Sequence, residues 1–114
     1  GGKTAAAVPR TLVFDEVDTG VGGRVAEAIG LRLKRLAEAN QVLCVTHLPQ
    51  IAGFADAHYA VSKLERDGQT FAALAELAGE ARVEELARML SGAKVTPEAM
   101  ANARQLLAAA GRVP

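Results

Sequence analysis

The chain has 114 residues, half of them hydrophobic, and its 13 basic side chains are balanced by 13 acidic ones. This length suits one small domain, and the balanced charge argues against nucleic-acid binding driven by bulk positive charge. The single cysteine excludes an internal disulfide framework. We find no apolar run long enough for a transmembrane helix and no signal-peptide pattern, so a reducing, cytoplasmic setting without membrane contact is expected.

The first part of the chain predicts a strand, a helix and a second strand. Residues 1–10 are interpreted as a lead-in loop or a vector-derived segment. The short apolar run 11–14 and the similar run 42–46 lack polar alternation, which is typical of strands buried on both faces of a parallel sheet. Between them, apolar residues recur at helical spacing over 24–40, with Asn40 as the expected stop. The sequence therefore predicts one βαβ unit.

The remaining residues predict a hairpin and three more helices. A short helix with Pro49 in its first turn is expected over 48–54. Asp67-Gly68 is a typical hairpin turn, and apolar runs flank it at 59–64 and 70–74. An amphipathic helix is expected from Glu80 to Ser91, with Gly92 as C-cap, and a last helix is expected from its N-cap Thr96 to about Ala110. Their arginines are interpreted as parts of solvated helix faces; these are Arg82, Arg88 and Arg104.

The first predicted strand ends in two acids, Asp15 and Glu16. Ligands of open parallel sheets bind beyond the carboxyl ends of the strands. An aspartate there can hold Mg²⁺, usually with much of its hydration, and a neighbouring glutamate can polarise a water that attacks a phosphate. This is the Walker B pattern. The alternative interpretation is a strand end followed by a solvated acidic turn.

Two further features lie near this acidic pair in the predicted fold. His47 follows the second strand, so Thr46 and His47 should lie at the same sheet edge as Asp15. A histidine there can donate a hydrogen bond to a phosphate, although an isolated one is more often structural. The glycine-rich segment from Asp18 to Gly23 allows close approach to a phosphate or a partner, or is a turn into the helix.

Gly2-Lys3-Thr4 matches only the end of a phosphate-binding loop. That loop needs a strand before it and a helix after it. The ten residues between Thr4 and Asp15 leave no room for that helix and a return strand, so we do not interpret these residues as a working phosphate loop.

Two stretches together carry a family resemblance. They are Leu12 to Gly23 (LVFDEVDTGVGG) and Val42 to Ala52 (VLCVTHLPQIA), supported downstream by Arg82 to Gly92 (RVEELARMLSG). The chain resembles the carboxy-terminal head segment of the RecN family, bacterial double-strand-break repair ATPases related to the structural-maintenance-of-chromosomes (SMC) proteins. Val17 after Asp-Glu favours this branch over transporter ATPases, which carry proline there.

The resemblance implies a fold and a set of roles. The fold would be part of a P-loop NTPase head of the ATP-binding-cassette and SMC type over residues 11–114, with ATP and Mg²⁺ as cofactors. Asp15 would be the Mg²⁺ ligand, Glu16 the catalytic base and His47 the switch histidine at the γ-phosphate. Asp18, Thr19, Gly20 and Gly22 would belong to the D-loop, which crosses to the opposite head. Gly22 stands where the wider pattern has aspartate, so that side-chain role is in doubt.

The resemblance also implies partners. The family's phosphate loop and signature motif lie upstream of the Walker B strand, so the chain is interpreted as a carboxy-terminal lobe that needs the amino-terminal half of the same head. A second head of a homodimer and, through the full-length protein, DNA would be further partners. The isolated chain is therefore expected to be inactive and to bind ATP weakly or not at all.

Other hypotheses stay open on the sequence. One is the head of another SMC-like or transporter ATPase. Another is a non-catalytic interaction domain that uses the βαβ core and the two last helices as its docking surface. A weaker one is a metal-dependent phosphatase that uses Asp15, Asp18, His47 and His58.

Overall fold

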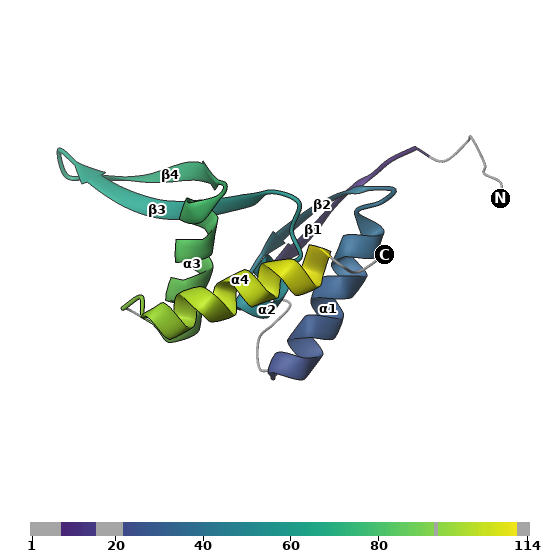
Figure 1. Ribbon diagram of the computed structural model, residues 1–114. Coiled ribbons are helices and arrows are strands. Elements are labelled where there is room, and N and C mark those ends of the chain that lie inside the picture. Colours follow the sequence, from purple (N-terminus) through teal and green to yellow (C-terminus); the bar gives the residue numbers. More distant parts are fainter. Residues whose placement is uncertain (1–7, 16–21, 93, 112–114) are drawn as a thin grey trace, which may run out of the picture.

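A computed structural model describes residues 8–15, 22–92 and 94–111. Within these ranges the chain is a mixed α/β structure with two separate two-stranded sheets and four helices (Figure 1). No helix among the described residues combines the length and the apolar character that crossing a bilayer requires.

The predicted βαβ unit is confirmed. It consists of β1 (Thr11–Asp15), α1 (Gly23–Leu36) and β2 (Gln41–Val45), and the two strands pair in parallel. Helix α1 ends at Leu36, short of the predicted end at Asn40. Asn40 still acts as the stop, because its side-chain amide Nδ2 donates a hydrogen bond to the Leu36 carbonyl over 3.0 Å. A side chain that bonds the last carbonyls replaces the missing helical partners.

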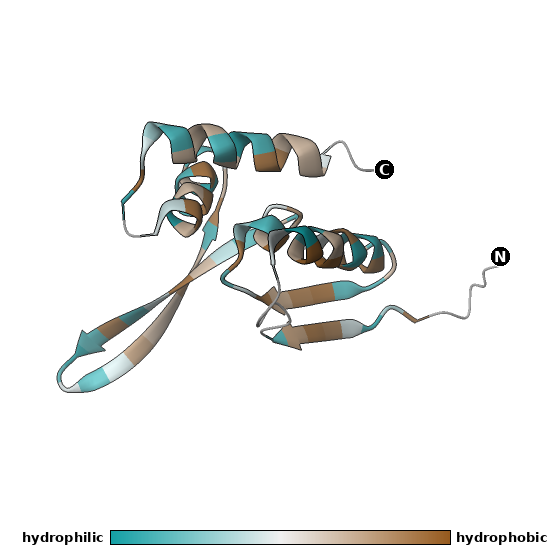
Figure 2. Ribbon diagram, turned by 90° about the horizontal axis from the view of Figure 1, so that it is seen from below, coloured by the Kyte–Doolittle hydropathy of each residue, from teal (hydrophilic) through white to brown (hydrophobic). Residues whose placement is uncertain are grey.

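The expectation that both faces of this sheet are buried is wrong for this chain. Alternate residues of β1 and β2 are half-buried, while Val13, Leu43 and Val45 on the other face are 66%, 49% and 58% exposed. Figure 2 shows α1 along one face of these apolar strands and no described element along the other. An apolar run shows that a strand suits burial on both faces, but burial itself also requires an element that covers each face.

A short helix and a long hairpin follow β2. Helix α2 (Pro49–Ala52) leads into β3 (His58–Arg66) and β4 (Gln69–Leu77), which pair antiparallel around Asp67-Gly68. Both turn residues have positive φ, 53° and 76°, as a tight hairpin turn requires. The hairpin is longer than predicted and projects away from the helices (Figure 1). Five of its large apolar side chains are exposed; they are Tyr59, Val61, Leu64, Phe71 and Leu74.

Helices α3 (Glu80–Ser91) and α4 (Pro97–Gly111) pack together and hold the core of the chain. Their predicted ends are confirmed. Gly92 follows α3 with a positive φ of 89°, and the Thr96 hydroxyl accepts a hydrogen bond from the Ala99 amide over 3.0 Å. The buried core joins α2 to these helices; its members are Ala52, Val83, Leu86, Ala87, Ala99 and Ala103.

Candidate functional site

The strand register brings the two predicted parts of the site to one edge of the sheet. Asp15, the last residue of β1, lies beside Val45, the last residue of β2. Thr46 and His47 come directly after Val45, so they leave the sheet at the same end as Asp15. The side chains of Asp15 and His47 are both exposed. This edge can therefore present a carboxylate and an imidazole to the same ligand.

The rest of the predicted site falls only partly within the described residues. Glu16, Asp18, Thr19 and Gly20 lie outside them, and their roles stay predictions. Gly22 is described and is the N-cap of α1, with extended backbone angles. Its carbonyl accepts the first helical hydrogen bond, from the Ala26 amide over 2.9 Å. Gly22 and Gly23, the described end of the glycine-rich segment, therefore form the start of α1.

The segment that carries His47 is anchored on both sides. On one side it continues β2. On the other, the Thr46 hydroxyl accepts a hydrogen bond from the Leu48 amide over 3.0 Å. Leu48 is the N-cap of α2, and its carbonyl accepts hydrogen bonds from the Ile51 and Ala52 amides. His47 therefore occupies a short bend between a strand and a helix rather than a long loop.

Arg82 is a functional candidate that the sequence interpretation missed. Its guanidinium Nη2 donates hydrogen bonds to the carbonyls of Ala55 over 2.7 Å and Ala52 over 3.2 Å, and lies 3.5 Å from the Gly53 carbonyl. Burial lowers the pKa of Arg82, and the nearby Asp56 carboxylate opposes that shift. The expectation that Arg82 belongs to a solvated helix face is therefore wrong. The available signal was its position four residues before Leu86, at the border of the apolar stripe of α3.

His58 lies beside Arg82 and does not join the sheet edge. Its pKa is lowered by burial and then by the Arg82 guanidinium, and the Glu85 carboxylate opposes both effects. The His58 Nδ1 atom is buried without a hydrogen-bond partner. Within residues 8–15, 22–92 and 94–111, no three His, Cys, Asp or Glu side chains are close enough to hold a metal ion. Asp18 lies outside the described residues, so the phosphatase hypothesis, which also uses Asp15, His47 and His58, stays a hypothesis.

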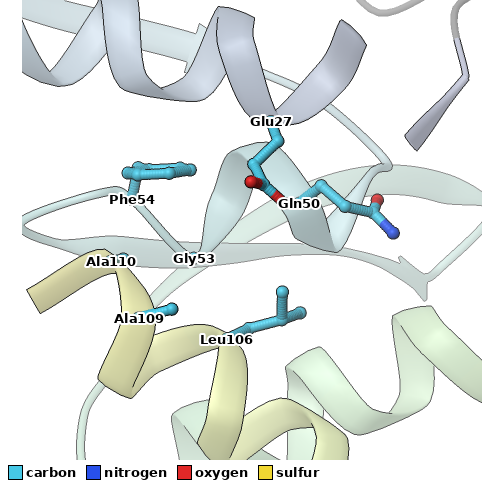
Figure 3. Close-up of a pocket in the computed structure, with 7 residues that line it drawn as sticks. All are labelled: Glu27, Gln50, Gly53, Phe54, Leu106, Ala109 and Ala110. Carbon is cyan, nitrogen blue, oxygen red and sulfur yellow. The ribbon is translucent and has the colours of Figure 1, made fainter. Parts of the chain in front are cut away.

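A small pocket lies between α1, α2 and α4, and none of its residues belongs to the predicted site. Figure 3 shows the Glu27 and Gln50 side chains close together on one side, with Phe54 and Leu106 around the apolar remainder. Gly53, Ala109 and Ala110 complete the lining. This pocket results from the packing of three helices and is separate from the residues that carry the predicted chemistry.

Comparison with known proteins provides an independent observation. DNA repair protein RecN of Xylella fastidiosa strain Temecula1 is 54% identical over 97 residues, which are 85% of this chain and 17% of that protein. RecN of Mycobacterium leprae is 53% identical over 104 residues, 91% of this chain and 17% of that protein. RecN of Bacillus subtilis is 43% identical over 103 residues, 90% of this chain and 18% of that protein.

The chain is similar to the carboxy-terminal segment of RecN. The resemblance seen in the sequence is thus confirmed, and it extends over most of the chain. The chain spans less than a fifth of the RecN proteins that it matches. No protein-family model matches it.

Proposed function

We propose that this chain forms the carboxy-terminal lobe of a RecN-like ATPase head of the P-loop NTPase class. The parallel register of β1 and β2 carries the proposal, because it places Asp15 and His47 at one sheet edge. In this proposal Asp15 holds Mg²⁺, and Glu16 accepts a proton from the attacking water. His47 donates a hydrogen bond to the γ-phosphate, and Asp18 to Gly22 contact the opposite head.

The chemistry of the described residues fits a metal that arrives with ATP. Proteins usually bind Mg²⁺ through one or two carboxylates, and phosphate oxygens and water complete the octahedron. Asp15 supplies one exposed carboxylate, and the described residues contain no metal cage of their own. Bound Mg²⁺ would neutralise charge that develops on the phosphates. The task of this chain is to position a carboxylate, a base and a hydrogen-bond donor around the nucleotide.

The exposed apolar face of β1 and β2 supports a partner within the same head. Val13, Leu43 and Val45 form an uncovered patch on a parallel sheet, an arrangement that is normally covered on both faces. In the proposal, the amino-terminal half of the head covers this face and supplies the phosphate loop and signature motif. A second head then closes the site around ATP.

The balanced charge of the chain suits a lobe that takes part in DNA repair without binding DNA through a basic surface of its own. With 13 basic and 13 acidic residues, it lacks the excess of positive charge that DNA-binding surfaces usually carry. The relatives are named DNA repair proteins. We infer that this lobe takes part in ATP-driven head engagement in double-strand-break repair, while DNA contacts lie largely outside it.

The proposal is tested in a hybrid RecN, in which this chain replaces the matching 97-residue segment of the Xylella fastidiosa protein. We expect Glu16→Gln to abolish ATP turnover while ATP binding remains, because glutamine keeps the size of the base but cannot accept the proton. Glu84→Gln is the matched control, since Glu84 is exposed on α3. Steady-state ATPase rates and nucleotide binding are the measurements.

The same experiment separates the enzyme from a non-catalytic interaction domain. If the Glu16→Gln hybrid hydrolyses ATP at the rate of the Glu84→Gln control, Glu16 is not the base and the ATPase proposal fails. The interaction-domain hypothesis would then take its place.

A further inference from the structure

Helix α2 is the junction between the two halves of the described structure. It packs against α1 on one side and against α3 and α4 on the other. On the α1 side, Gly30 leaves room for the Phe54 ring that follows α2: a Cβ atom at Gly30 would lie 2.4 Å from the ring's Cδ2. On the α4 side, a Cβ atom at Gly53 would lie 3.7 Å from the Leu106 Cβ. Close packing against α1 and α4 therefore fixes the position of α2.

Arg82 of α3 forms side-chain hydrogen bonds to the carboxyl end of α2. Helix α2 has only four residues, and the carbonyls of Pro49, Ile51 and Ala52 accept hydrogen bonds from the backbone amides that follow the helix. The Arg82 guanidinium bonds the Ala52 and Ala55 carbonyls and lies beside that of Gly53. A charged donor is a strong hydrogen-bond partner, so removing it takes away the guanidinium bonds to both carbonyls, although the Ala52 carbonyl also accepts the Ala55 amide over 3.1 Å. Arg82 thus holds the carboxyl end of α2 against α3.

The amino end of α2 leads directly to the sheet edge. Pro49 is its first residue, Leu48 its N-cap, and His47 comes immediately before. The Leu48 amide donates a hydrogen bond to the Thr46 hydroxyl, so the backbone of this bend is held in a fixed conformation. A shift of α2 relative to β2 would therefore be transmitted to the residues from Thr46 to Leu48. The imidazole of His47 would then move relative to Asp15.

We propose that Arg82 is a positioning residue for His47, which acts by holding the carboxyl end of α2 against α3. The inference rests on the proposed function, in which His47 contacts the γ-phosphate. It also implies that a displacement of α3 and α4 would shift α2 and thereby move His47 at the sheet edge that carries Asp15. Arg104 offers a contrast: it pairs with Glu80 across α4 and α3 over 2.8 Å and bonds no carbonyl of α2.

The test is a double-mutant cycle in the hybrid RecN, with ATP turnover as the readout. We expect Arg82→Gln to lower kcat between about tenfold and a hundredfold, as small misplacements of catalytic groups do, with little change in KM for ATP. In a His47→Gln background the same substitution should have almost no further effect, because the group it positions is already absent. Arg104→Gln removes the same charge from the same helix pair and should leave turnover unchanged.

The possible outcomes are distinct. If Arg82→Gln lowers kcat equally in both backgrounds, Arg82 acts on general stability and the inference is wrong. If His47→Gln alone leaves turnover unchanged, the proposed role of His47 fails, whatever Arg82 does. Arg82→Lys keeps the charge and most of the stem, so it covers the case in which the glutamine variant does not fold. Its loss of kcat should be smaller than that of Arg82→Gln and should also disappear in the His47→Gln background.

Discussion

At the scale of single residues, Arg82 and His58 are half-buried neighbours whose charges interact. The guanidinium is bonded to backbone carbonyls and stays charged, while the neighbouring imidazole has a lowered pKa. A second positive charge at His58 would be repelled by Arg82 and costly to bury. His58 therefore favours its neutral form in the folded chain.

This environment predicts that stability falls as the pH falls. The folded pKa of His58 lies below the unfolded value of 6.5, so the unfolded chain binds more protons between these two values. Stability from neutral His58 is present above pH 6.5 and is lost as the pH decreases toward the folded pKa. Urea unfolding of the chain between about pH 8 and pH 5 measures this loss.

Substitution isolates the contribution of His58. His58→Gln should flatten the pH dependence over this window. An unchanged slope in His58→Gln would show that other groups cause the pH dependence.

At the scale of elements, the contact between α1 and α2 depends on one small residue. A Cβ atom at Gly30 would lie 2.4 Å from the Phe54 ring and 3.1 Å from the backbone carbonyl of Gln50. Gly23, in the first turn of the same helix, has only the flexible Gln50 side chain nearby, at 3.8 Å. Two glycines of one helix thus have opposite steric environments.

We expect Gly30→Ala to destabilise the chain by about 1–3 kcal/mol through overpacking, despite the gain of roughly 1 kcal/mol in helix propensity. Gly23→Ala should be neutral or slightly stabilising, because nothing rigid opposes the added methyl group. Thermal unfolding of the two variants beside the parent chain measures both effects. A Gly30→Ala variant that melts at or above the parent would contradict this packing between α1 and α2.

At the scale of the whole molecule, the chain is open rather than compact. Its accessible surface is 7977 Å², whereas a compact monomer of 11.8 kDa exposes about 5,900 Å². The radius of gyration is 15.9 Å, against about 13 Å for a compact domain of 100 residues. The uncovered sheet face and the projecting hairpin contribute to this exposed surface. In the proposed head, these surfaces meet other parts of a RecN-like protein.

If the chain is one lobe of a larger head, it should not bind nucleotide well on its own. Calorimetric titration of the isolated chain with Mg²⁺ and ATP should give no measurable heat, because in the proposal the amino-terminal half supplies the phosphate loop, with its backbone donors and lysine. The hybrid RecN, titrated in the same way, should bind. Micromolar binding by the isolated chain, abolished by Lys3→Ala, would show that Gly2-Lys3-Thr4 holds phosphate after all and that the lobe interpretation is wrong.

Local signals in the sequence determined much of the fold and the placement of the candidate site. Apolar periodicity, Asp67-Gly68, Thr96 and Gly92 indicated the elements and their order, because helices, turns and caps depend on residues close in sequence. Two apolar strands in a βαβ unit also sufficed to predict that Asp15 and His47 share one sheet edge, since parallel strands end on the same side.

Only the tertiary structure decided which of these surfaces are covered and which polar groups are buried. Val13 belongs to an apolar strand yet is exposed, because no described element of this chain lies over that face. Arg82 lies on an amphipathic helix yet bonds the end of α2, which precedes it by about thirty residues. Such contacts join segments far apart in the chain, so the spacing of residues along the sequence does not specify them.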